Sequence, residues 1–119
     1  MGEPTLYFNI ISQPARTIEV LLKIGNVAHT RKDIDLMAGE QRTEEYKKNV
    51  NQRGKVPVFV DGDYKITESS AIAKYILASR KGSFPATLWP EDPKKRAEID
   101  ALIEYYQNHY RPQITGPLV

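Results

Sequence analysis

The sequence predicts an α/β domain with the element order β-α-β-α-β-β-α, followed by a connector and one long helix. Three observations support this fold class. Residues 5–11 and 56–66 are rich in β-branched and aromatic residues, as strands are. Apolar residues at helical spacing follow both segments. An Asp-Gly pair at 61–62 divides the second segment as a hairpin turn would.

The first strand and helix are expected at the N-terminus. Thr5–Ile11 has the composition of a buried strand, and Ser12–Pro14 breaks it. Proline is tolerated in the first helical turn because its missing N–H has no partner there. A helix is therefore expected from Ala15, and Gly25-Asn26 supplies its stop. Its apolar face consists of Ile18, Leu21 and Leu22.

The middle of the chain is less strongly patterned. His29–Asp35 is polar enough to predict a strand near a sheet edge. A short helix is expected around Thr43–Lys48, although its apolar face is poor. Val56–Val60 and Asp63–Ile66 then form the predicted hairpin, and Asp61-Gly62 suits the positive φ angles of a type I′ turn.

The C-terminal third predicts two further helices. Thr67–Ser70 opens the first, which has Ile72, Tyr75 and Ile76 on one stripe and ends at Lys81-Gly82. The connector contains Phe84, Leu88 and Trp89, more large apolar groups than a solvated linker carries, so we expect it to pack down. A long amphipathic helix follows from 93 to about 110, with Pro112 and Gly116-Pro117 ending it. The expected divisions are an α/β domain at 1–81, a linker at 82–92 and a helical segment at 93–119.

Composition excludes several classes of protein. The 119 residues contain no cysteine, which removes disulfides, thiolate metal sites and a cysteine nucleophile. The two histidines, at 29 and 109, cannot form a zinc site without carboxylate ligands. A net charge of +2 does not indicate nucleic-acid binding. No apolar run approaches the roughly 18–20 residues of a membrane span, and no secretory signal is visible at the N-terminus. These features fit a cytoplasmic protein.

Three short motifs could support chemistry, and each has a plain structural alternative. Ser12 begins Ser12–Arg16 at a strand-to-helix turn, where a hydroxyl and free N–H groups can stabilise a thiolate; an ordinary N-cap serine would look the same. A cis bond before Pro57 would leave the Val56 backbone free to pair with an extended peptide, whereas most X-Pro bonds are trans. Glu68 and Ser69 at the next helix start could hold an ammonium and a carboxylate. Alternatively, Thr67 or Ser69 simply caps the helix, and the acidic residue complements its dipole.

The joint occurrence of these motifs favours the functional reading. A thiolate site, a peptide-pairing site and a zwitterion site at three loop ends together match a thiol tripeptide with a γ-glutamyl head. The chain resembles the glutathione transferase family, most closely its serine-type theta class. The matching residues are Leu6-Tyr7, Ser12–Arg16, Asp35-Leu36 with Gly39, Asn51 with Lys55–Pro57, Asp61–Asp63, Thr67–Ser69 with Ala71-Ile72, Trp89-Pro90 and Arg96-Ala97.

The resemblance implies a fold and an activity. The fold would be a thioredoxin-like domain, a linker and the first helix of an all-α C-terminal domain. The activity would be activation of glutathione as a thiolate for attack on small electrophiles, with glutathione as co-substrate and no permanently bound cofactor. The family also implies a homodimer. The alternative is a non-catalytic glutathione-transferase-like module, as in translation elongation factor complexes.

The resemblance also implies residue roles. Ser12 would hydrogen-bond the glutathione sulfur, and Val56, before the cis-proline Pro57, would pair with the cysteinyl backbone. Glu68 and Ser69 would hold the γ-glutamyl amino and carboxylate groups. The residues expected to contact the glycyl carboxylate are Lys55 and Gln41, the latter a neutral donor where the theta pattern often has histidine.

Other positions depart from the pattern or have two readings. Gln52 replaces the usual proline. Asn108 falls near the place of an acidic residue that approaches the γ-glutamyl group from the partner subunit. Tyr7 lies too far before the helix to replace Ser12 and is expected on the sheet. Arg111 could attract an anionic substrate group, but a solvated helix-end cation is the simpler reading. Two readings also apply to a cluster of tyrosines: they could line an apolar substrate pocket, but packing between helices is the simpler reading. The cluster consists of Tyr105, Tyr106 and Tyr110.

Overall fold

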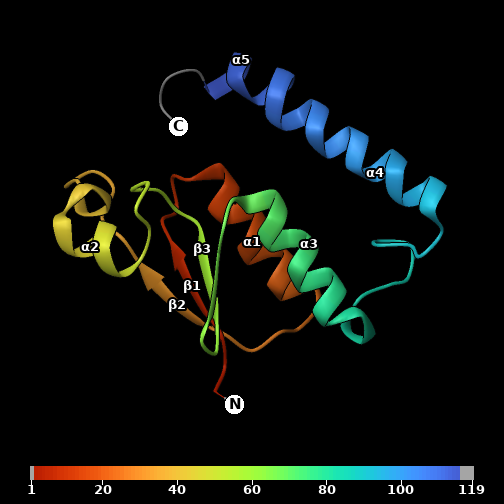
Figure 1. Cartoon of the computed structure of the whole chain (residues 1–119), viewed down its shortest axis with the longest axis horizontal. Coiled ribbons are helices and arrows are strands. Elements are labelled where there is room, and N and C mark those ends of the chain that lie inside the picture. Colours follow the sequence, from red (N-terminus) through yellow and green to blue (C-terminus); the bar gives the residue numbers. More distant parts are fainter. Residues whose placement is uncertain (1, 116–119) are drawn as a thin grey trace.

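A mixed four-stranded sheet with strand order β2-β1-β3-β4 organises the protein (Figure 1). The computed structural model describes residues 2–115. Its strands are β1 (Thr5–Phe8), β2 (Thr30–Asp33), β3 (Val58–Asp61) and β4 (Tyr64–Thr67). Its α-helices are α1 (Gln13–Ile24), α2 (Glu44–Asn49), α3 (Ser69–Ser79), α4 (Pro93–Tyr105) and α5 (Arg111–Thr115). The predicted order β-α-β-α-β-β-α is confirmed. β2 runs parallel to β1, and the other pairs are antiparallel.

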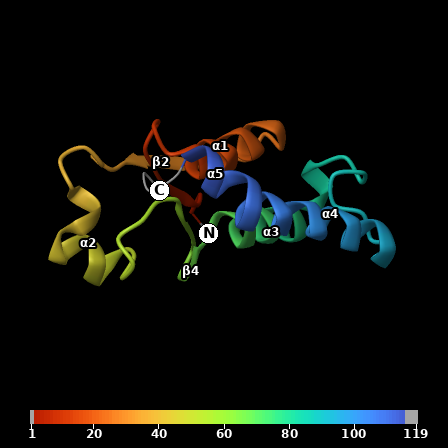
Figure 2. The same cartoon turned by 90° about the horizontal axis from the view of Figure 1, so that it is seen from above.

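The core lies between one face of the sheet and helices α1 and α3, which lie side by side (Figures 1 and 2). Alternation along β1 buries Leu6 and Phe8 on this face. The fully buried residues that meet them are Ile18 and Leu22 of α1, Phe59 of β3, and Ile72 and Ile76 of α3. Tyr7 points to the opposite face, where its ring packs edge-on against Tyr46 of α2. This position agrees with its expected place on the sheet.

β1 ends three residues earlier than the predicted limit at Ile11. The Asn9 side chain replaces the sheet ladder at this point: its Oδ1 accepts from the Ile11 N–H at 2.9 Å, and its Nδ2 donates to the Ile34 carbonyl at 2.7 Å. An asparagine that bonds its own backbone two residues on forms a turn. The loop 9–12 is therefore shaped by side chains rather than by a longer strand.

The hairpin is present, but its turn is not the predicted type I′. Asp61 pairs with Tyr64, so Gly62 and Asp63 are the central residues. Gly62 has a φ of 67°, whereas the φ of Asp63 is not positive. A type I′ turn needs positive φ at both central positions. The glycine is still required, but at the first central position.

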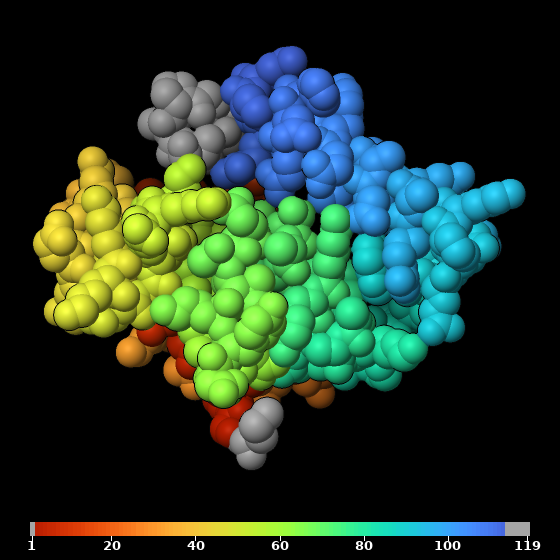
Figure 3. Space-filling model, in the orientation of Figure 1, coloured from red at the N-terminus to blue at the C-terminus, as the bar shows by residue number. Residues whose placement is uncertain are grey.

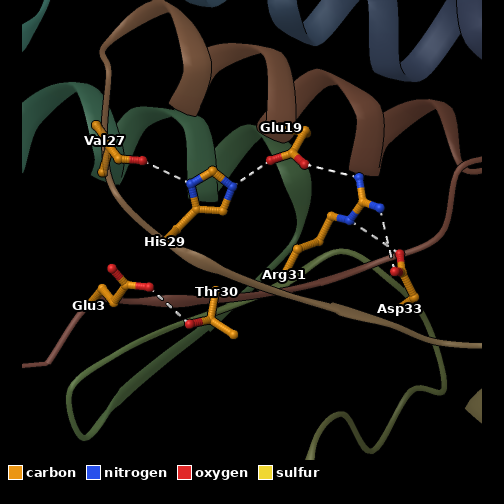
Figure 4. Close-up of polar contacts among 7 residues, drawn as sticks. All are labelled: Glu3, Glu19, Val27, His29, Thr30, Arg31 and Asp33. Atoms are coloured by element: carbon orange, nitrogen blue, oxygen red, sulfur yellow. Dashed lines mark hydrogen bonds and ion pairs between the residues drawn. The ribbon is translucent and has the colours of Figure 1, made fainter.

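A buried polar network joins α1 to the edge strand β2 (Figure 4). Glu19 is only 8% exposed and accepts from His29 Nε2 at 2.5 Å and from Arg31 Nη1 at 3.2 Å. His29 Nδ1 lies 2.8 Å from the Val27 carbonyl oxygen, and Arg31 also pairs with Asp33. The carboxylate is thus satisfied from two directions, as a buried charge must be. The network fixes the polar strand that was expected near the sheet edge.

The connector after α3 packs down, as its apolar residues predict. Phe84 is buried in the main core, and Trp89 packs against it. Arg96 lies over the Trp89 ring, with its guanidinium carbon 4.6 Å from the ring centroid. These contacts anchor the start of α4.

The last helix continues past Pro112, which was expected to end it. Tyr106–Tyr110 form a π-helical turn between α4 and α5. A proline ring collides with the carbonyl four residues earlier, here that of Asn108, and this carbonyl lies in the wider π turn. The widening lets the helix run to Thr115. The predicted stop at Gly116-Pro117 lies outside the described residues. Within the described part, no helix is long and apolar enough to cross a membrane.

Candidate functional site

A polar cleft of about 360 Å³ lies between the N-terminus of α3, the loop before β3 and the C-terminal helix. Five of the predicted site residues line it: Lys55, Val56, Pro57, Glu68 and Ser69. Figure 3 shows the segment that lies above α3, the cyan-to-blue ridge of residues 93–115 over the green surface. Residues from three separate parts of the chain therefore meet in one site.

The loop before β3 is held in place from below by buried side chains. The Lys55 carbonyl accepts from the Tyr46 hydroxyl at 2.8 Å and from Asn51 Nδ2 at 3.1 Å. Burial, with the nearby Tyr7 and Glu40, raises the Tyr46 pKa, so this phenol stays a donor. The Val56–Pro57 bond is cis, the isomer that the resemblance implies. No described residue hydrogen-bonds the Val56 backbone, which leaves it open toward the cleft.

Glu68 and Ser69 start α3 in an unusual conformation. Glu68 is the N-cap residue with φ 75° and ψ 116°, and its side chain makes no capping bond. Such a backbone is costly for a residue other than glycine and is typical of ligand sites. Its carboxylate is 60% exposed and lies 3.3 Å from Arg53 Nη1, so it is held only by a surface ion pair. The free N–H groups in the first turn of α3 can donate hydrogen bonds to an anion, and the helix dipole stabilises negative charge there.

Ser12 is the N-cap residue of α1. Its Oγ accepts from the Ala15 N–H at 3.2 Å, so the structural reading of this serine is confirmed. Arg16 Nη1 donates to the Ile10 carbonyl at 2.6 Å and thereby fixes the loop that presents Ser12. Ser12 itself is not among the described residues lining the polar cleft, although Pro14 is.

Gln41 does not share the cleft with Lys55. It belongs to the short 3₁₀ turn Glu40–Arg42, and its Oε1 is buried with no hydrogen-bond partner among the described residues. Its backbone carbonyl lies against Gly54, where an added Cβ would come within 2.8 Å of the oxygen. Gln41 therefore supports the loop before Pro57 through its backbone.

An apolar cleft of about 550 Å³ adjoins the polar one between α1, α3 and α4. The three tyrosines at 105, 106 and 110 line it. Tyr105 and Tyr110 are 57% and 50% exposed. Pro14, Ser69, Ser70 and Gln107 line both clefts. A molecule in the polar cleft would thus touch one in the apolar cleft.

Four polar residues of the C-terminal helix also line the polar cleft: Glu104, Gln107, Asn108 and Arg111. Glu104 and Gln107 were not identified from the sequence. Their i, i+3, i+4, i+7 spacing puts all four on one helical face, and this signal was overlooked beside the apolar stripe. Arg111 is half-buried in the cleft, so it is not the solvated helix-end cation that was expected. No described group of three or more histidine or carboxylate side chains is arranged to hold a metal ion.

Fold and cleft together define the class of protein. It is a thioredoxin-like domain whose polar cleft lies at a helix N-terminus, beside a cis-proline loop. Residues 3–78 match the family model described as "Glutathione S-transferase, N-terminal domain". The chain therefore belongs to this glutathione S-transferase family.

Individual relatives agree with this assignment. The chain is 30% identical to human glutathione S-transferase theta-2 over 122 residues, which cover 96% of this chain and 49% of that protein. It is 34% identical to Arabidopsis thaliana glutathione S-transferase F10, covering 92% and 50%. A glutathione transferase homolog from Drosophila mojavensis, solved with bound glutathione, matches with a TM-score of 0.84 and 32% identity over 91% of this chain and 48% of that one. The chain spans about half the length of each of these three proteins.

Proposed function

We propose that this chain is the glutathione-binding half of a glutathione transferase. The observation that supports this most directly is the meeting of Glu68, Ser69 and Val56 in one polar cleft. A carboxylate beside a helix N-terminus offers complementary partners to the ammonium and carboxylate of an amino-acid head group. An open backbone one residue before a cis-proline can pair with an extended peptide. Glutathione presents both features.

In this proposal each site residue has one role. Glu68 accepts from the γ-glutamyl ammonium, and Ser69 with the α3 N–H groups donates to its carboxylate. Val56 pairs with the cysteinyl backbone. Lys55 attracts the glycyl carboxylate, with Gln41 as the weaker contributor because its side chain does not line the cleft.

Ser12 is proposed as the group that favours the thiolate. Its Oγ accepts from Ala15, so its own hydrogen is available to the glutathione sulfur. A hydrogen bond to the charged form lowers a thiol pKa. The thiol proton passes to water. The thiolate electron pair then forms the bond to the electrophilic carbon, and the leaving group departs with the electrons of its broken bond. An apolar electrophile fits the adjoining cleft with its three tyrosines.

The remaining proposals follow from the family. We infer a homodimer in the cytoplasm, acting on small electrophiles. The domain divisions 1–81, 82–92 and 93–119 are proposed as the glutathione-binding domain, the linker and the start of an all-α domain.

Two variants test the role of Ser12. Ser12→Ala removes both the cap and the proposed thiolate donor, whereas Thr43→Ala removes a cap of the same geometry, 3.2 Å from the Tyr46 N–H, away from the thiol. Each should cost about 1 kcal/mol of unfolding free energy. Only Ser12→Ala should raise the pKa of bound glutathione, followed by thiolate ultraviolet absorbance against pH, and depress conjugation of aryl electrophiles. An unchanged pKa in Ser12→Ala would remove this role from Ser12.

Binding and turnover are measured separately. Calorimetry with glutathione tests the site, and conjugation of a panel of electrophiles tests the enzyme. Glutathione binding with no conjugation would favour the non-catalytic module. Absence of glutathione binding would refute the proposal as a whole.

A further inference from the structure

Gln107 connects the C-terminal helix to the proposed glutathione site. Its Nε2 lies 3.2 Å from the Ser69 Oγ, although the two residues are 38 positions apart. A second polar contact, the ion pair Lys74–Asp100 at 2.7 Å, joins α3 to α4 on a different part of the helix. Gln107 is half-buried and lines both clefts. Gln107 therefore lies where glutathione in the polar cleft and an electrophile in the apolar cleft would meet.

The direction of this hydrogen bond follows from the chemistry of its neighbours. Arg111 Nη1 lies 3.5 Å from the Gln107 Oε1, and a guanidinium can only donate. The Gln107 oxygen is thus assigned to Arg111 and its NH₂ group to Ser69. Because the amide nitrogen donates to it, the Ser69 oxygen is an acceptor in this contact. The Ser69 hydroxyl hydrogen remains free to be donated into the polar cleft.

The backbone at this point is specialised as well. Gln107 lies in the π-helical turn Tyr106–Tyr110, where the Arg111 N–H bonds the Tyr106 carbonyl five residues earlier. Single π turns inside α-helices occur frequently at functional sites. The wider turn changes the angular positions of the side chains that follow, and the polar face of residues 104–111 meets the cleft across it.

We propose that Gln107 is a positioning residue that holds the Ser69 hydroxyl as a donor to the α-carboxylate of the γ-glutamyl group. The inference rests on the proposed function, because it assigns Ser69 to that carboxylate. It adds a residue of the second domain to the glutathione site. It also makes the selectivity for the carboxylate depend on the docking of the C-terminal helix against α3.

The test compares two ligands and three variants of the full chain. The ligands are glutathione and 4-aminobutyryl-Cys-Gly, which lacks only the α-carboxylate. Gln107→Leu removes the donor at similar size. Gln107→Glu supplies an acceptor instead, so Ser69 would donate to the new carboxylate rather than to the ligand. Gln113→Leu is the matched control, because Gln113 is exposed on the same helix and does not line either cleft among the described residues.

The expected result is a selective loss of affinity measured by calorimetry. Gln107→Leu should weaken glutathione binding by about 3- to 10-fold and Gln107→Glu by more, because it adds a like charge. Neither should weaken binding of the analogue without the carboxylate, and Gln113→Leu should change nothing. Circular dichroism of all variants checks that the fold is kept.

Two results would overturn the inference while leaving the proposed function intact: unchanged glutathione affinity in Gln107→Leu, or an equal loss for both ligands. The second would mean that Gln107 only supports the fold. If the unmodified chain binds glutathione no better than it binds the analogue, the carboxylate contact itself is wrong. If it binds neither, the proposed function fails and this inference with it.

Discussion

The Phe84 ring lies directly on Gly25, so closely that a Cβ placed on that glycine would be 2.3 Å from the ring. Gly25 is the C-cap residue of α1 and is buried, while Phe84 belongs to the connector that leads to α4. The φ of Gly25 is −81°, which any residue can adopt. A glycine is therefore required here by the lack of space for a side chain and not by the backbone conformation. This contact fixes the connector, and with it the start of the helix that closes both clefts.

Gly25→Ala should destabilise the protein by about 1–3 kcal/mol, the usual cost of overpacking a core. The matched control is Gly82→Ala, where an added Cβ meets nothing within 4 Å. Urea unfolding of both variants measures the difference. Adding Phe84→Leu to Gly25→Ala should cost less than the sum of the two single changes, because the smaller side chain relieves the overlap. Strict additivity would contradict a direct clash.

Gly54→Ala should damage the glutathione site more than the fold. Gly54 has φ 64°, and its Cβ would lie 2.8 Å from the Gln41 carbonyl oxygen, so the loop that carries Lys55 and Val56 must move. Gly39→Ala is the control for backbone strain without steric overlap, because Gly39 has φ 80° but an added Cβ there would meet no other atom within 4 Å. Both should lose about 1–2 kcal/mol of stability. Only Gly54→Ala should also weaken glutathione binding, measured by calorimetry. Equal losses of glutathione affinity in both variants would mean that backbone strain alone is responsible.

Asp61 should make part of the stability depend on pH. Hydrogen bonds from Arg80 at 3.1 Å and from Tyr75 at 2.6 Å hold the Asp61 pKa below its ordinary value of 3.8. A lowered folded pKa stabilises the protein above the unfolded value, and this contribution is lost as pH falls through the folded pKa. Asp61→Asn should therefore be less stable than the parent by about 1–3 kcal/mol at neutral pH. The gap should shrink below about pH 4.

Glu91→Gln is the control for the Asp61 experiment. Lys81 also lowers the pKa of Glu91, by a hydrogen bond at 2.9 Å, but both side chains are largely exposed. Solvent and salt screen such a pair, so its removal should leave chemical unfolding curves almost unchanged at every pH. A pH-dependent loss in this variant as large as that of Asp61→Asn would show that the buried hydrogen bonds are not the cause.

His29→Ala should destabilise the protein because it leaves Glu19 buried with one partner fewer. Arg31 still reaches the carboxylate at 3.2 Å, so the expected cost is about 2–3 kcal/mol rather than the 3–5 kcal/mol of a fully orphaned buried charge. Thermal unfolding measures it. The double variant His29→Ala with Glu19→Leu should recover part of the loss, since it removes the charge as well. A further loss in that double variant would show that Glu19 has a role beyond this network.

Local sequence signals predict most of the elements. Ser12, Thr43 and Asp92 each cap a helix through a bond to the N–H three residues on. Such bonds span one turn and can be read from spacing alone. The errors have local causes too. Asn9 ended β1 early through its side chain, and a π turn let the last helix pass Pro112. The first depends on side-chain geometry and the second on backbone geometry, and residue type alone reveals neither.

The sequence by itself determined the order of the elements, the family resemblance and the residues at the three loop ends, because capping, periodicity and turn chemistry act over a few positions. Only the tertiary structure decided which of those residues share a cleft. Lys55 and Ser69 meet there, whereas Gln41 stays behind the loop. Only the tertiary structure also paired Gln107 with Ser69. That contact depends on how the last helix is rotated and docked by Phe84, Trp89 and the π turn, and no short-range pattern specifies such a rotation.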